Sequence, residues 1–94
     1  MPLPTIVWDP AKAATNLSKH GVDFEEAATI FRDPLLLVLE DSGHSQEEER
    51  WIALGQSVRQ LLLVVVHTDD ERIIRIISAR QATPRERRFY EQQD

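Results

Sequence analysis

The apolar segment Leu61–Thr68 is the feature that most restricts how this chain can fold. Its first six residues are aliphatic without interruption, which is typical of a strand that is covered on both faces and lies inside a sheet. An acidic turn at 69–71 separates it from the isoleucine-rich segment Arg72–Ala79. Two such segments around a tight turn predict a β-hairpin whose first strand is central in the sheet.

Helix start and stop signals define two helices ahead of this hairpin. The first begins at Asp9, an N-cap residue that precedes Pro10 at the first helical position, and it ends at Gly21. The second begins at Asp23, carries apolar residues at helical spacing, and ends before Pro34. Helices this short need a partner to pack on, and we expect that partner to be the sheet.

Three further strands and a last helix complete the predicted fold. The strands are Thr5–Trp8, Leu35–Leu39 and Arg50–Leu54, and the helix starts with a capping box at Thr83–Glu86. The predicted order is therefore β-α-α-β-β-β-β-α, in which two leading helices and one closing helix pack on an antiparallel sheet. We expect an α+β fold in one domain that spans residues 1–94.

Several classes of site are disfavoured by residues that the chain lacks. Without cysteine it has no disulfide framework and no thiolate site for zinc. Its three histidines are scattered, without the paired spacing of a metal motif, so we expect neither a metal nor any other cofactor. The apolar runs are too short to span a membrane, and the N-terminus lacks the basic and apolar regions of a signal peptide. We therefore expect a cytoplasmic protein that does not bind a membrane.

The charge is distributed unevenly along the chain. The net charge is −5, and the first 71 residues hold thirteen acids against five bases, with much of the acid in a loop at 40–49. Between positions 72 and 90 the balance reverses to six arginines and one acid. A local basic patch of this kind can bind an anion even in an acidic protein. For Arg85, Arg87 and Arg88 the plainer interpretation is the solvated face of the last helix.

Arginines within the second arm of the hairpin are the leading candidates for that patch. Arg75 has an isoleucine two residues away on each side, so it either pairs with a buried acid or points into a concave site. In a regular strand Ser78 and Arg80 share one face, while Arg75 lies on the other. Arg75 and Arg80 can then serve one site only where a bulge, or the end of the strand, re-aims Arg80.

A histidine ends the central strand close to this second arm. His67 is predicted to share a face with Leu63 and Val65 and to lie beside Arg75 across the hairpin. A neighbouring cation lowers the affinity of an imidazole for its proton, which suits a general base near neutral pH. The alternative is a strand-end histidine at the protein surface without a chemical role.

Four other residues carry groups that bind RNA or move protons, and each has a plainer interpretation. Lys19 and His20 end the first helix, where the helix dipole already favours a cation. Glu86 is accounted for by the capping box. Tyr90 can belong to the core, stack on a base or donate a proton.

These side chains together fit one reaction better than others. In metal-independent RNA cleavage the 2′-hydroxyl attacks the adjacent phosphate, so the RNA itself supplies the nucleophile. The protein must accept one proton, stabilise charge on the phosphate and donate a proton to the leaving oxygen. His, Lys, Glu and Tyr side chains can transfer the protons, and Arg can stabilise the charge.

Three parts of the chain resemble the BrnT toxin family, in the same order and over nearly the whole length. The first comprises Trp8-Asp9-Pro10-x-Lys12 and Asn16-Leu17-x-Lys19-His20-Gly21-Val22-x-Phe24-x-Glu26-Ala27. The second is the strand Leu63–Thr68, and the third comprises Arg75–Ala82 and Glu86–Glu91.

The resemblance implies a ribonuclease toxin with a RelE-like fold, one half of a type II toxin–antitoxin pair that inhibits translation and growth. It implies a cognate antitoxin that forms a hetero-oligomer with the toxin and binds the operator DNA. Carried over to this chain, the functional residues of the family are Arg75, Arg80 and His67 as catalytic groups and, more loosely, Lys19, His20, Glu86 and Tyr90, with Ser78 as support for Arg80. The alternative is a non-catalytic module of the same fold that binds RNA or the antitoxin.

Overall fold

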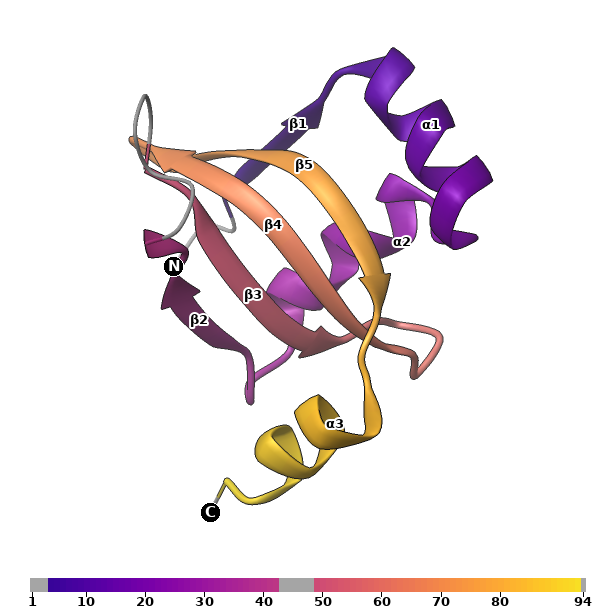
Figure 1. The fold of residues 1–94 in the computed structure, drawn as a ribbon. Coiled ribbons are helices and arrows are strands. Elements are labelled where there is room, and N and C mark those ends of the chain that lie inside the picture. Colours follow the sequence, from indigo (N-terminus) through magenta and orange to yellow (C-terminus); the bar gives the residue numbers. More distant parts are fainter. Residues whose placement is uncertain (1–3, 43–48, 94) are drawn as a thin grey trace.

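The computed structural model describes residues 4–42 and 49–93 and contains a five-stranded sheet in the order β1-β5-β4-β3-β2 (Figure 1). In chain order the elements are β1 (Thr5–Trp8), α1 (Pro10–His20), α2 (Phe24–Ala28), the 3₁₀ helix η1 (Thr29–Arg32), β2 (Leu37–Glu40), β3 (Trp51–Gln56), β4 (Leu62–Asp70), β5 (Ile73–Gln81) and α3 (Pro84–Glu91). The α+β class is confirmed, and each predicted strand is present with its ends shifted by at most two residues.

The pairing of the strands differs from the antiparallel sheet that the sequence predicted. Strands β2 to β5 pair antiparallel, but β1 pairs with β5 in parallel, from Thr5 opposite Ile73 to Trp8 opposite Ile76. The sheet is therefore mixed. The helical segments α1, α2 and η1 carry the chain from β1 at one edge of the sheet to β2 at the other edge. Strand β4 lies in the middle of the sheet, as its apolar sequence predicted.

The signals that predicted the helices form capping contacts in the structure. The side chain of Asp9 accepts a hydrogen bond from the first turn of α1, and Gly21 ends this helix with a φ of 71°. Helix α3 begins with a complete capping box between Thr83 and Glu86. Helix α2 is shorter than predicted, because the chain tightens into η1 after five residues.

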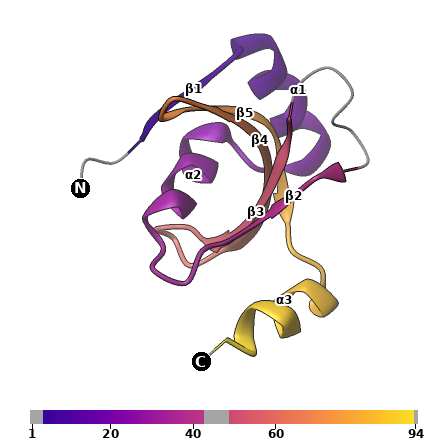
Figure 2. The same ribbon diagram turned by 90° about the vertical axis from the view of Figure 1, so that its left-hand side faces the viewer.

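The main core lies between the sheet and the helical segments α2 and η1, which sit inside the curve of the sheet (Figure 2). Phe24 and Ile30 are fully buried there, and Trp8 meets Phe24 edge to face with ring centroids 6.1 Å apart. Gly55 of β3 faces Ile30 and Leu36 across this core. A β-carbon at Gly55 would lie 2.8 Å from the side chain of Leu36 and 3.2 Å from that of Ile30. The close approach of η1 to β3 therefore depends on glycine at this position.

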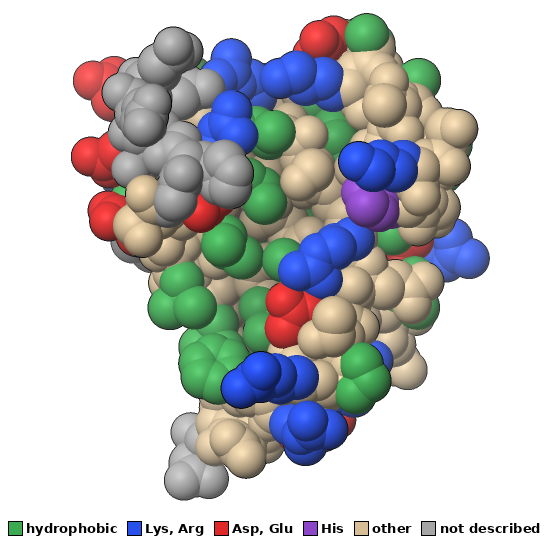
Figure 3. Space-filling view, viewed as in Figure 1, with side chains coloured by type: hydrophobic (Ala, Val, Ile, Leu, Met, Phe, Trp, Pro, Cys, Tyr) green, Lys and Arg blue, Asp and Glu red, His purple; other side chains and the backbone are tan. Residues whose placement is uncertain are grey.

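The opposite face of the sheet is called the open face below. Helix α3 packs on it through Tyr90, which forms a second cluster with Leu54, Leu62 and Val64. Hydrophobic side chains continue across this face, with Lys and Arg side chains along their borders (Figure 3). A ligand that approaches from this side therefore meets apolar surface next to positive charge.

The β4–β5 hairpin turns later than predicted, at Glu71 and Arg72 rather than at 69–71. Both residues have positive φ, 49° and 71°. Two successive left-handed residues form a type I′ turn, whose twist matches that of the strands on either side. Most of the acidic loop at 40–49 lies outside the described residues. In the part of the chain that the structure describes, the helices are too short or too polar to cross a membrane.

Candidate functional site

A β-bulge in β5 determines where the polar side chains of this strand point. Val66 of β4 pairs with Ser78, but the next residue, His67, pairs with Ile76. Ile77 is therefore an extra residue of β5 at a shift in register. Such a bulge bends the strand and changes which face the following side chains take.

The bulge brings Arg75, Ser78 and Arg80 to the open face. Ile76 and Ala79 both belong to the main core, so the residues next to them point to the opposite side of the sheet. The cross-strand partner of Arg80 also belongs to the cluster on the open face. The two-sided arrangement expected for a regular strand is therefore wrong. The bulge, named above as the alternative, places both arginines on one face, and Ser78 shares that face with Arg80 as predicted.

Asn16 fastens α1 to β5 just beyond the bulge. Its buried amide group donates to the carbonyl oxygens of Val22 and Ala79, at 3.0 and 2.8 Å. Its side-chain oxygen accepts a hydrogen bond from the backbone N–H of Ala79 at 3.0 Å. Side chains on the same face of α1 are thereby held over the bulged part of β5.

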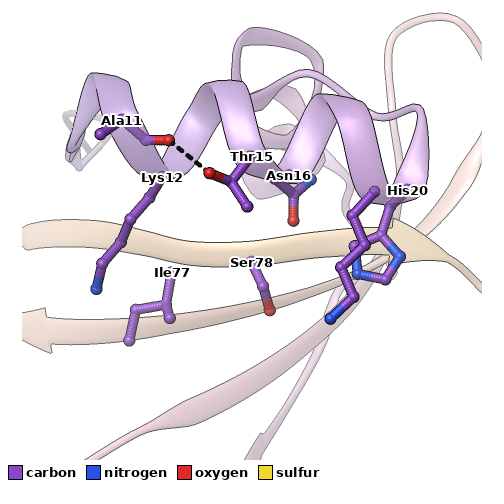
Figure 4. Close-up of a pocket in the computed structure, with 8 residues that line it drawn as sticks. Ala11, Lys12, Thr15, Asn16, His20, Ile77 and Ser78 are labelled. Carbon is purple, nitrogen blue, oxygen red and sulfur yellow. Dashed lines mark hydrogen bonds between the residues drawn. The ribbon is translucent and has the colours of Figure 1, made fainter.

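A pocket of about 310 Å³ lies between α1 and β5. Lys12, Lys19 and His20 line it from α1, and Ser78 lines it from β5. Figure 4 shows Lys12 and His20 reaching over the strand on either side of Ser78. The structure therefore brings together three of the predicted residues and adds Lys12. The sequence could have identified Lys12 as a pocket residue, because its helical spacing from Asn16 and Lys19 puts the three side chains on one face of α1.

Arg80 forms a two-pronged ion pair with Glu86 of α3. Its Nη1 and Nη2 atoms donate to the two carboxylate oxygens at 2.8 and 2.9 Å. One of these oxygens also accepts the backbone N–H of Thr83 in the capping box. The hydrogen bonds from Arg80 lower the pKa of Glu86 to about 2. Glu86 is therefore an anion at neutral pH that orients Arg80, and a carboxylate with so low a pKa is a weak base.

Arg75 is exposed on the open face, between Thr68 of β4 and Val7 of β1. It lines a hollow of about 530 Å³ together with acidic residues at the end of β4 and just before β3. Its position fits the concave-site alternative and does not fit a buried ion pair. Arg75 and Arg80 are separated by roughly 16 Å along the strand, with Ser78 between them.

His67 lies away from this group of residues. Its side chain is 2% exposed on the core side of the sheet, where its ring meets Phe31 edge-on with centroids 5.1 Å apart. The Nδ1 atom is 3.1 Å from the carbonyl oxygen of Thr68, and Nε2 is buried without a hydrogen-bond partner. Burial lowers the pKa of His67. The expected contact between His67 and Arg75 is wrong, because they lie on opposite faces of the sheet.

Tyr90 is also engaged away from the pocket. Its ring is buried in the cluster on the open face, and its hydroxyl donates a hydrogen bond to the carboxylate of Asp33. Burial, followed by the contact with Asp33, raises the pKa of Tyr90 to about 12. Burial alone would raise the pKa of Asp33, but the hydrogen bonds that it accepts from Tyr90, Gln56 and Leu35 lower it. This contact fastens α3 to the segment between η1 and β2.

The resulting arrangement suits the binding of a phosphodiester. Cationic side chains of α1 line the pocket on the open face, and Figure 3 shows Lys and Arg side chains over this side of the molecule. Among residues 4–42 and 49–93, three or more His, Cys, Asp or Glu side chains do not gather into a possible metal site. The arginines of α3 are exposed, and Arg87 pairs with Glu91 at 3.9 Å.

Comparison with known proteins identifies related sequences and folds. The sequence model of the family described as "Ribonuclease toxin, BrnT, of type II toxin-antitoxin system" matches residues 8–86. A search of curated proteins finds no match. Among solved structures, the crystal structure of the ribonuclease toxin BrnT from Brucella abortus is similar, with a TM-score of 0.64 and 24% sequence identity. The similarity covers 85% of this chain and 97% of that chain, and at this identity it concerns the fold.

Proposed function

The chain belongs to the BrnT family of ribonuclease toxins of type II toxin–antitoxin systems, and we propose that it cleaves RNA without a metal ion, by attack of a 2′-hydroxyl on the adjacent phosphate. One observation carries this proposal. The bulge at Ile77 brings Arg75, Ser78 and Arg80 to the face on which α1 presents its own cations.

In the proposed reaction Arg75 and Arg80 stabilise the negative charge that builds up on the phosphate in the transition state. The contacts with Glu86 and with the carbonyl oxygen of Gln81 engage three of the five N–H donors of Arg80, and the other two are available. Lys12 and Lys19 add positive charge at the pocket over Ser78, a residue that lies between the two arginines along β5. Such a donor, aimed at developing charge in a fixed position, typically contributes about a hundred- to thousandfold to the rate.

We assign proton transfer to His20, with Ser78 as a hydrogen-bonding support for the phosphate. An imidazole is the side chain that most often exchanges protons near neutral pH. His20 lines the pocket opposite Ser78, whereas His67 is buried on the other side of the sheet. Glu86 and Tyr90 are given structural roles, because each is already engaged in a strong contact elsewhere.

Membership of a type II toxin–antitoxin family implies an antitoxin protein as partner. We propose that this antitoxin neutralises the toxin by covering the cationic pocket and the arginines of the open face. We further propose that the two proteins form a hetero-oligomer which binds the operator DNA through the antitoxin. Continued accessibility of Arg75 and Arg80 in the complex would contradict inhibition by direct coverage.

The test is cleavage of naked RNA by the purified protein in a buffer that contains a chelator of divalent ions. The proposal predicts products with 2′,3′-cyclic phosphate ends, and growth arrest when the toxin is induced without its antitoxin. Binding of RNA without cleavage and without growth arrest would instead support a non-catalytic module of the same fold.

A further inference from the structure

A second hollow on the open face lies between the sheet and α3. It has a volume of about 360 Å³, and we call it the α3 groove. Its floor contains Ile52, Leu54 and Val64 of the sheet, and α3 contributes Arg85, Glu86 and Phe89 to its wall. The hydrophobic side chains that cross the open face in Figure 3 are consistent with a mainly apolar floor.

The α3 groove is continuous with the position of Arg80. Val64 on its floor is the cross-strand partner of Arg80, and Glu86 on its wall forms the ion pair with the same arginine. A phosphate held by Arg80 therefore places the adjoining nucleotide at the entrance of the groove. The groove shares none of its lining residues with the cationic pocket.

Phe89 gives this groove an exposed aromatic ring. Its side chain is 53% exposed, whereas the neighbouring Tyr90 is 9% exposed and packs beneath α3. Exposed aromatic side chains next to a basic surface are the usual platform on which single-stranded nucleic acids stack their bases. The positive charge of Arg85 at the same groove favours a nucleotide further.

The size of the groove also favours a nucleotide. Pockets for small molecules have volumes of roughly 300–1,000 Å³, and this groove is near the lower end of that range. It suits one base with its ribose, whereas a helix or strand of a protein partner needs a longer surface.

We propose that the α3 groove is a nucleobase subsite, in which Phe89 stacks on the base of the nucleotide next to the phosphate at Arg80. This inference rests on the proposed function, because it needs RNA at Arg80. Both carboxylate oxygens of Glu86 are already engaged by Arg80 and Thr83. Glu86 therefore has no free carboxylate oxygen with which to read the edge of a base, and in this proposal the base is held mainly by its face, so that the subsite accepts different bases.

The test measures affinity for short RNA oligonucleotides that carry 2′-deoxyribose at the attacking position, so that cleavage does not interfere. One oligonucleotide is complete, and a second series lacks a single base, with the abasic position moved along the chain. We expect one abasic position to weaken binding by roughly 5- to 100-fold, the range for the loss of one base–aromatic stack. Phe89→Ala should weaken binding of the complete RNA by a similar factor.

Two comparisons separate stacking from a general loss of apolar surface. Phe89→Ala should have little further effect on the abasic RNA that binds most weakly to the wild type, because the stack is already absent. Val58→Ala is the matched control, since Val58 is an exposed apolar residue, 62% exposed, that does not line the groove. This control should bind RNA as the wild type does.

Equal affinity of the wild type for the complete RNA and every abasic RNA would overturn the subsite while leaving the proposed function intact. The same conclusion follows if Phe89→Ala binds RNA normally but loses affinity for the antitoxin, because the groove would then belong to that partner. Failure of the wild type to bind any RNA would contradict the proposed function itself, and the subsite with it.

Discussion

The side chain of Asn16 pairs with the backbone of Ala79 as another strand would. It donates to the carbonyl oxygen of Ala79 and accepts from its N–H, at 2.8 and 3.0 Å. Strand β1 has already ended, with Trp8 opposite Ile76, when β5 reaches this point. Asn16 thus replaces the missing neighbour at the edge of the sheet, and the same contact sets α1 and its cations over Ser78.

Asn16→Ala should lower the free energy of unfolding by roughly 2–4 kcal/mol, because it leaves buried backbone groups of Ala79 without partners. Urea unfolding measures this loss. Thr15→Ala is the control on the same helix, since Thr15 is exposed and its side chain bonds only to the carbonyl of Ala11 among the contacts described. Equal stability of the two variants would show that the Asn16 contact does not hold α1 in place.

Glu86→Gln should flatten the acid side of the stability profile. The pKa of Glu86 is lowered from 4.5 to about 2 in the folded protein, chiefly by its hydrogen bonds with Arg80. The unfolded chain therefore takes up a proton first as the pH falls, and the contribution of this pair is lost between about pH 4.5 and 2. Glutamine keeps the capping box but has no carboxylate to titrate. Unfolding free energies of both proteins from pH 6 to 2 measure the difference, and parallel profiles would contradict the prediction.

His67→Leu should reduce the loss of stability below neutral pH. Burial lowers the pKa of His67 from its ordinary 6.5, against weaker opposing effects of the Thr68 carbonyl and Asp69. The unfolded chain binds a proton as the pH falls through about 6.5 while the folded protein resists it, so stability is complete above this pH and decreases below it. The slope is at most about 1.4 kcal/mol per pH unit.

Urea midpoints at pH 7.5 and pH 5.5 measure the contribution of His67. We expect the wild type to lose more stability between these two values than His67→Leu does. His20→Gln is the control, because it removes an exposed histidine and leaves His67 in place. An equal loss in the wild type and in His67→Leu would show that His67 is not responsible.

Tyr90→Phe should lower stability but preserve RNA cleavage. The substitution removes the hydrogen bond to the carboxylate of Asp33, and bonds to a charged group contribute about 1.5–3 kcal/mol. Its ring still fills the cluster on the open face. Thermal unfolding and the cleavage rate are measured on the same preparation. A variant with native stability and a strongly reduced rate would instead show that the tyrosine acts on the substrate.

The sequence predicted those parts of the fold that local signals determine. Asp9 and Gly21 mark the ends of α1 because capping depends on a few neighbouring residues, and the apolar run of β4 marks a central strand. The parallel pairing of β1 could not be predicted in this way, because it depends on which distant segments meet at the sheet edge.

The geometry of the candidate site was predicted only in part, because it also depends on how distant segments pair. Arg75, Ser78 and Arg80 were identified by residue type, but their common face results from one extra residue, Ile77, whose side chain resembles those around it. His67 was placed on the correct face of β4, with Leu63 and Val65. His67 is separated from Arg75 because the register of β5 pairs His67 with Ile76. This register could not be predicted from a sequence in which several isoleucines are interchangeable.

The most direct test of the account compares RNA cleavage by Arg75→Ala, Arg80→Ala and His67→Leu, each shown to be folded, with the wild type. Arg87→Ala is the matched control, because it removes an arginine of α3 that pairs with Glu91. We predict that each of the first two variants loses about a hundred- to thousandfold in rate, while His67→Leu and Arg87→Ala cleave as the wild type does. Normal cleavage by both Arg75→Ala and Arg80→Ala, or loss of activity in a folded His67→Leu, would contradict a catalytic site on the open face.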